Sequence, residues 1–260
     1  MKEGEIIQGL MLSLSKKQYS INDLLYLIQP FNISPSSLRT NLWRLIKKNF
    51  LKTIRQGKKA YYSLSAKAKI ISKNVALSFK SPDWHGWDNS WWGIVFSVPE
   101  NKKPVRHRIR KKLLAYRFAP LYAGFWIRPF HAEEKLDNYL QNIFDHGYGK
   151  MIHFHSLNTI TKEEISRIWK LKQVNQLLYQ GIALLKENHK ELKKFMAKEA
   201  LAKKIFIGNE IVPILFKDPL LPAQFLPEDW QAENLRKFFF KWDNEITKIA
   251  QPYWQKIFIQ

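Results

Sequence analysis

Basic and polar side chains gather in the segment 34–48, where helical spacing would place most of them on one side. Their types suit contact with nucleic acid, because Lys and Arg neutralise phosphates while Arg, Asn, Ser and Thr form hydrogen bonds with base edges. The candidates are Ser36, Ser37, Arg39, Thr40, Asn41, Arg44, Lys47 and Lys48. This set predicts binding to duplex DNA.

Two short helices joined by a tight turn are expected to position these side chains. Ser20, with Asp23 three residues on, is a capping signature, and the apolar stripe that follows stops before Pro30. Ser34 followed by Pro35 is a second helix start. The apolar face of the second helix comprises Leu38, Leu42, Leu45 and Ile46. The basic set should therefore point outwards.

A hairpin with a basic tip is predicted to follow. Residues 51–54 and 60–64 form its strands, and a glycine stands among the cations of the tip, Arg55-Gln56-Gly57-Lys58-Lys59. Such a tip suits a wing that lies along a DNA backbone, so Arg55, Lys58 and Lys59 join the DNA-binding candidates. With a linking helix over 66–79, residues 1–80 are predicted to form a winged helix-turn-helix DNA-binding domain.

The alternative is a helical unit whose basic face is merely solvated, or a winged helix that binds protein. The distribution of charge along the chain favours a nucleic-acid partner over these alternatives. Residues 1–80 hold 15 Lys and Arg against 3 Asp and Glu, a net +12 of the chain's +21. Clustered positive charge is typical of a polyanion partner, since each neutralised phosphate releases counterions.

Composition excludes several other classes of protein. The 260 residues suffice for two or three compact units, and 45% of them are hydrophobic, which is enough for real cores. The chain has no cysteine, so disulfides and thiolate chemistry are excluded. No apolar run approaches the ~20 residues of a membrane span, and the N-terminus lacks the order of a signal peptide. A cytoplasmic location without membrane contact is expected.

A second unit is predicted over 81–157. The apolar run WWGIVFSV at 91–98 indicates a buried strand. The further elements expected are a helix over 103–118, a strand over 125–128, a helix over 133–144 and a strand over 151–155. Three strands alternating with two helices predict a ferredoxin-like α/β unit with helices on one side of the sheet.

From Thr161 onward only helical spacing remains, so residues 158–260 are predicted to be a helical C-terminal domain for dimerisation or effector binding. The expected fold class is α+β: an N-terminal winged helix-turn-helix, a central ferredoxin-like unit and a C-terminal helical domain. Regulators that read palindromic DNA sites commonly dimerise through such a domain.

The order of segments resembles the PaaX family of transcriptional regulators, over about residues 21–240. The stretches that carry the resemblance are LLYLIQPFNISPSSLRTNLWRLIKKNFL, RQGKKAYYSL, WWGIVFSVPENKKPVRHRIRKKLLAYRFAPLYAGFWIRP and KDPLLPAQFLPEDW. The resemblance implies a homodimeric repressor of an aromatic-acid catabolic operon, of the phenylacetate type, released from operator DNA by an acyl-CoA thioester such as phenylacetyl-CoA. Two departures are Lys217, where a more Arg-rich run is expected, and the high overall basicity.

An acyl-CoA would need cations for its phosphates and aromatic walls for its acyl tip. The effector-binding candidates are Arg106, Arg110, Arg128, Trp87, Trp126 and Trp169. The alternative for each residue is structural, with the arginines paired or solvated and the tryptophans in cores.

The middle unit also resembles the small CRISPR-associated ferredoxin-like endonuclease subunit, which places a metal-binding carboxylate at the end of its first strand. Here Ser97 stands at that position, and a hydroxyl is a poor Mg²⁺ ligand. Glu100 lies beyond the proline. His153 and His155 share a strand face but lack an apparent third ligand. No catalytic residue, metal site or cofactor is therefore expected. The alternatives kept open are a metal-dependent nuclease and an effector-independent DNA-binding protein.

Overall fold

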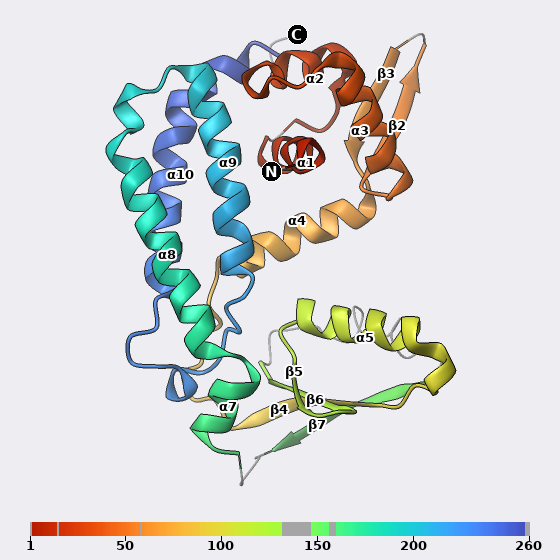
Figure 1. The fold of residues 1–260 in the computed structure, drawn as a ribbon, viewed down its shortest axis with the longest axis vertical. Coiled ribbons are helices and arrows are strands. Elements are labelled where there is room, and N and C mark those ends of the chain that lie inside the picture. The colour runs from red at the N-terminus through yellow and green to blue at the C-terminus, as the bar shows by residue number, and fades with distance from the viewer. Residues whose placement is uncertain (1, 15, 58, 132–146, 156–159, 258–260) are drawn as a thin grey trace. The chain divides into compact units, whose positions relative to one another are not determined.

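The computed structural model describes residues 2–14, 16–57, 59–131, 147–155 and 160–257 (Figure 1). It contains two compact units, and each takes segments that lie far apart in the sequence. Unit 1 comprises Met1–Lys80, Leu178–Leu215 and Glu233–Gln260, and unit 2 comprises Ser81–Leu177 and Phe216–Ala232. Among the described residues, no helix is both long enough and apolar enough to span a membrane.

The N-terminal part of unit 1 combines helices with a three-stranded antiparallel sheet in the order β1-β3-β2. Its elements are α1 (Glu3–Ser13), β1 (Tyr19–Ser20), α2 (Ile21–Leu27), η1 (Gln29–Phe31), α3 (Pro35–Lys47), β2 (Leu51–Gln56), β3 (Lys59–Leu64) and α4 (Ala66–Ser78). Both predicted helix starts are confirmed. The Ser20 hydroxyl accepts a hydrogen bond from the Asp23 backbone N–H, and the Ser34 hydroxyl accepts one from that of Ser37.

Helix α1 was not predicted from the sequence, although it completes the core of this unit. Ile6, Ile7, Leu10 and Met11 are buried. The helix packs against α3 and against α9 (Ala197–Leu215), which lies almost two hundred residues further along the chain. The asparagine amide of Asn209 on α9 donates to the Glu5 carbonyl.

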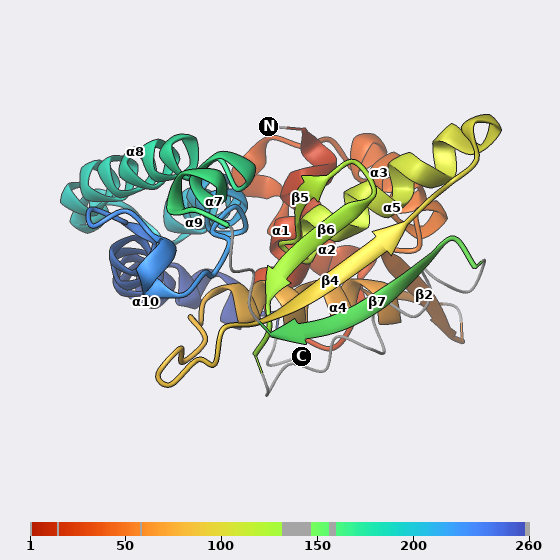
Figure 2. The ribbon, with the colours of Figure 1, turned by 90° about the horizontal axis from the view of Figure 1, so that it is seen from below.

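Three long helices supply the remainder of unit 1. They are α8 (Leu171–Lys190, in this unit from Leu178), α9 and α10 (Ala232–Gln255), with the short η3 (Leu192–Lys194) between α8 and α9. A Cβ at Gly181 of α8 would lie 3.1 Å from a methyl of Leu235 on α10, so the two helices approach closely there. Figures 1 and 2 both show α8, α9 and α10 side by side. The helical C-terminal part expected from the sequence is thus present.

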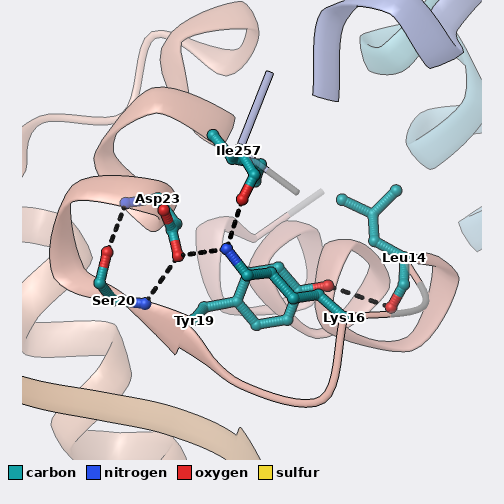
Figure 3. Close-up of polar contacts among 6 residues, drawn as sticks. All are labelled: Leu14, Lys16, Tyr19, Ser20, Asp23 and Ile257. Atoms are coloured by element: carbon teal, nitrogen blue, oxygen red, sulfur yellow. Dashed lines mark hydrogen bonds and ion pairs between the residues drawn. The ribbon is translucent and has the colours of Figure 1, made fainter. Parts of the chain in front are cut away.

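The end of α10 is tied back to the start of the chain (Figure 3). Lys16 Nζ donates to Asp23 Oδ2 at 2.9 Å and to the Ile257 carbonyl at 2.5 Å. Tyr26 of α2 and Tyr253 of α10 stack at a centroid distance of 4.6 Å, and each hydroxyl donates to the other residue's carbonyl. Burial raises the pKa of the Tyr253 hydroxyl to about 12. These contacts fix α2, which precedes α3 in the chain, against the C-terminal end of α10.

Unit 2 is built on a four-stranded antiparallel sheet in the order β5-β6-β4-β7. Its elements are β4 (Ser90–Phe96), η2 (Glu100–Lys102), α5 (Lys103–Ala115), β5 (Ala119–Tyr122), β6 (Phe125–Pro129), β7 (Gly149–His155), α7 (Lys162–Ile168) and η4 (Ala223–Phe225). Figure 1 shows α5 lying over one face of the sheet.

Two sequence predictions for this unit need correction. Strand β5 was missed, so the sheet has four strands rather than three; the strand is only four residues long and contains Pro120, which weakens its sequence signal. The helix expected over 103–118 ends at Ala115, and Arg117 then adopts φ 64° before β5 begins. The helix expected over 133–144 lies outside the described residues.

Side chains from alternate positions of β4 fill cores on both faces of the sheet. Ile94 and Phe96 pack with Leu113 of α5 on one face, whereas Trp91 packs with Trp169 on the other. Gly93 lies on the same face of β4 as Trp91, and a Cβ there would stand 2.7 Å from a ring atom of Phe125 and under 3 Å from Ile152 and Phe154. The missing side chain lets the neighbouring strands close over this position.

Candidate nucleic-acid interface

Helix α3 is fixed by its apolar face and by its first turn. Leu38, Leu42 and Leu45 are all less than 4% exposed, as the stripe in the sequence predicted. Pro35 stands at the first helical position, where its missing N–H costs no hydrogen bond. Because the buried face is anchored in this way, the opposite face is held in a defined orientation.

The outward face of α3 carries most of the predicted DNA-binding side chains. Those that are exposed are Ser36, Arg39, Thr40, Arg44, Lys47 and Lys48. The Thr40 hydroxyl donates to the Ser36 carbonyl one turn earlier, which fixes its rotamer. The structure therefore brings four cations and two hydroxyls together on one helix surface.

Ser37 and Asn41 point towards α1 instead. The Ser37 hydroxyl and the Asn41 Nδ2 both donate to Oε2 of Glu3, the Asn41 bond being 3.1 Å long. Both side chains are half-buried, and a Cβ at Gly4 would lie 3.2 Å from the Asn41 amide oxygen. Ser37 and Asn41 therefore link α3 to α1. Either side chain could contact a DNA base only after its hydrogen bond to Glu3 breaks.

A groove of about 1060 Å³ opens between the start of α1 and α3. Glu3 and Glu5 line one side of it, and Thr40, Arg44 and Lys48 line the other. Lys2 also lines the groove, which therefore holds three cations against two carboxylates. The opposite flank of α3 faces away from these carboxylates. That flank carries Arg39 and Lys47.

Trp43 is a residue of this surface that the sequence prediction missed. It lies on the outward face of α3 and is 60% exposed, and the Lys47 ammonium stands 5.5 Å from its ring centroid. The available signal was an aromatic residue on the polar side of an amphipathic helix.

The hairpin predicted after α3 is present. Strands β2 and β3 pair from Leu51↔Leu64 to Gln56↔Lys59, and Gly57 at the turn has φ 58°, a conformation that favours glycine. Arg55 and Lys59 are exposed. Lys58 lies outside the described residues.

The effector-binding candidates of unit 2 do not form one wall. Trp126 belongs to the core under α5, whereas Trp87 and Trp169 belong to the core on the other face of the sheet. Arg128 is 4% exposed and donates to the Tyr116 carbonyl at 3.1 Å. These four side chains take part in the packing of unit 2.

Arg106 and Arg110 lie on α5. Arg106 donates to the Val98 carbonyl and to Glu100 Oε2 at 2.8 Å, and this hydrogen bond holds the pKa of the Glu100 carboxyl below its usual range. Arg110 is exposed. Of the six candidates, Arg110 is therefore the most accessible to a ligand in solution.

The structure also shows where the residues that could take part in metal chemistry lie. Ser97 is exposed just beyond the end of β4, and its backbone N–H donates to the Tyr148 carbonyl. His153 and His155 lie on the same face of β7 with ring centroids 5.4 Å apart. Within the described residues, no group of three or more His, Asp or Glu side chains could hold a metal ion.

Together these features define a two-unit α+β protein that presents a basic helix beside a basic hairpin. Three sequence-family models match along the chain: PaaX-like protein over residues 8–68, the PaaX protein central Cas2-like domain over 85–165 and the PaaX-like protein C-terminal domain over 169–256. The chain belongs to the PaaX family.

Two individual proteins are similar to this chain, one in sequence and one in fold. Transcriptional repressor PaaX of Escherichia coli (strain K12) is 22% identical over 231 residues, which cover 84% of this chain and 71% of that protein. The solved structure of uncharacterized protein Rv0674 from Mycobacterium tuberculosis aligns with a TM-score of 0.62 at 17% identity and covers 94% of this chain and 95% of that one. The structural match establishes likeness of fold alone.

Proposed function

We propose that this protein is a transcriptional repressor that binds duplex DNA through a winged helix-turn-helix formed by α2, α3 and the β2–β3 hairpin. The observation that carries the proposal is the outward face of α3, where Arg39, Thr40, Arg44 and Lys47 stand exposed on a helix fixed by its buried leucines. An α-helix fits the major groove, and these side chains suit phosphates and base edges. The sequence relationship to a transcriptional repressor supports the same reading.

Arg44 and Lys59 are assigned different roles, which can be separated by measurement. Arg44→Ala is expected to weaken binding to a selected duplex by ~1–3 kcal/mol and to relax base preference at one position. Lys59→Ala, at the tip of the hairpin, is expected to weaken all duplexes alike and to lower the salt-dependence slope by about one. Fluorescence anisotropy titrations at several salt concentrations give both quantities.

The duplex for these titrations is obtained by selection from a random double-stranded library with the wild-type protein. An equal loss of affinity for selected and random duplexes would remove Arg44 from base reading. Failure of the wild-type protein to enrich any sequence would contradict the proposed function itself.

We further propose that the repressor is a homodimer that acts in the cytoplasm and is released from DNA by an acyl-CoA thioester. Two α3 helices one helical turn apart, ~34–36 Å, would read the two halves of a palindrome. A thioester that binds one arrangement of the dimer better than the other would shift its affinity for DNA, and a coupling of ~1–3 kcal/mol is typical. The phenylacetate-type operon is the expected target.

The effector proposal has a direct test. Phenylacetyl-CoA and related thioesters are titrated into the protein by calorimetry, and affinity for the selected duplex is then measured with and without them. The expected result is a 5–150-fold loss of DNA affinity. Binding no tighter than about millimolar, or binding that leaves DNA affinity unchanged, would contradict the acyl-CoA switch and leave DNA binding standing.

We propose a regulator without enzymatic activity. Ser97 supports this, because its hydroxyl stands where a metal-dependent nuclease of the ferredoxin-like type would need a carboxylate. The assay is incubation of single- and double-stranded nucleic acids with the protein and Mg²⁺ or Mn²⁺. Cleavage that is lost on chelation would contradict the proposal.

A further inference from the structure

Trp43 is an apolar side chain in a strongly polar setting. It is 60% exposed at the middle of the outward face of α3, and Arg39, Thr40 and Lys47 lie one helical turn from it on the same side. Most large apolar residues of this unit are buried, including Leu42 just before it. An exposed tryptophan on a fixed helix, surrounded by cations and hydroxyls, offers an apolar contact to a partner that also binds those polar groups.

The surroundings of Trp43 restrict the chemistry of that partner. A protein with an apolar groove would have to bury the neighbouring cations together with the ring, and unpaired buried charges are unfavourable. Duplex DNA fits better, because phosphates accept the cations while the major groove presents an apolar group at each thymine, the C5-methyl. The Lys47 ammonium, 5.5 Å from the ring centroid, is placed to meet a phosphate beside the base that the ring contacts.

We propose that Trp43 is a specificity-determining residue that reads thymine by packing its indole ring against the C5-methyl group in the major groove. This inference rests on the proposed DNA-binding function and deepens it. Arg44 then reads a base edge through hydrogen bonds, while Trp43, its neighbour, reads a methyl group. The contact distinguishes A·T from G·C pairs without a hydrogen bond from the ring.

The test uses 2′-deoxyuridine, which differs from thymidine only by the missing methyl group. The probe is the best-enriched duplex selected by the wild-type protein, in which each thymine is replaced by uracil one at a time. For the wild type, at least one replacement is expected to weaken binding about fourfold, the equivalent of the ~0.8 kcal/mol of one buried methylene-sized group. For Trp43→Ala, the same replacement is expected to have no further effect.

Lys47→Ala is the matched control from the same helix face. It should lower the salt slope while keeping the fourfold thymine-to-uracil difference, because it removes a phosphate contact and leaves the ring. Trp43→Phe should keep part of the difference. Thermal unfolding of Trp43→Ala is measured as well and should match that of the wild type, since the side chain is mostly outside the core.

The outcomes separate this inference from the function on which it rests. A wild-type protein that enriches no duplex contradicts the proposed function. A wild-type protein that enriches a duplex but is insensitive to every uracil, or a Trp43→Ala variant that keeps the sensitivity, overturns the role of Trp43 alone. In that case the exposed ring is assigned to contact with another protein.

Discussion

Asp243→Ala is expected to destabilise unit 1 by about 3 kcal/mol, the lower end of the range for a buried ion pair, because the Asp243 side chain is 33% exposed. Lys204 of α9 is 8% exposed, and its ammonium donates to the Asp243 carboxylate of α10 and, at 2.8 Å, to the Thr247 hydroxyl. Removal of the carboxylate leaves a buried cation with a neutral partner, and breaking a buried ion pair from one side costs about this amount. Urea unfolding, together with hydrogen exchange of the α9 and α10 amides, measures the loss.

The controls for Asp243→Ala are the reverse change and the double change. Lys204→Met keeps most of the side-chain volume and leaves Asp243 partly exposed to water, so a smaller loss is expected. The Lys204→Met, Asp243→Ala protein should recover most of the stability, because an apolar replacement of a buried pair is often neutral. A double variant whose loss equals the sum of the two single losses would show that the two side chains are not coupled.

Leu42→Ala is expected to destabilise unit 1 by ~2–5 kcal/mol. The side chain is 1% exposed on the buried face of α3, so its truncation loses apolar burial and leaves a cavity. Chemical denaturation gives the free energy of unfolding. DNA affinity, corrected for the folded fraction, should keep the wild-type sequence preference, because the outward side chains are unchanged.

Trp43→Ala, one residue further along, is the matched control for Leu42→Ala. It should change the free energy of unfolding by about 0.5 kcal/mol or less but alter the DNA sequence preference. Leu42 is thus expected to affect stability and Trp43 to affect DNA recognition, although the two residues are adjacent. A loss for Leu42→Ala below ~1 kcal/mol would mean that α3 is not anchored through its leucines.

The elements that carry local signals were predictable from sequence. Ser20, Ser34 and Pro35 specify where helices begin, and the leucines of α3 specify which face is buried, because caps and periodicity act within a few residues. The hairpin and the central strand β4 followed from the same kind of pattern. The sequence therefore predicted most of the candidate surface on α3.

The features that were missed depend on distant residues. Helix α1 has few cap signals and is held by α9, and the pairing of Glu3 with Ser37 and Asn41 joins positions more than thirty residues apart. Trp126 and Trp169 were both predicted to line one effector site, yet they fill cores on opposite sides of one sheet. Such placements are decided by tertiary packing.

The bond between Lys16 and the Ile257 carbonyl has a consequence for protein synthesis. Ribosomes add ~5–20 residues per second, so the 241 positions that separate these residues emerge over roughly 10–50 s. During that time the nascent chain carries α3 and its cations without the tie to α10, and α1 without α9. A chain terminated before α9 would expose the side of α1 around Gly9, which packs against Ile205 and Asn209 of α9, and is expected to be cleared by proteases rather than accumulate.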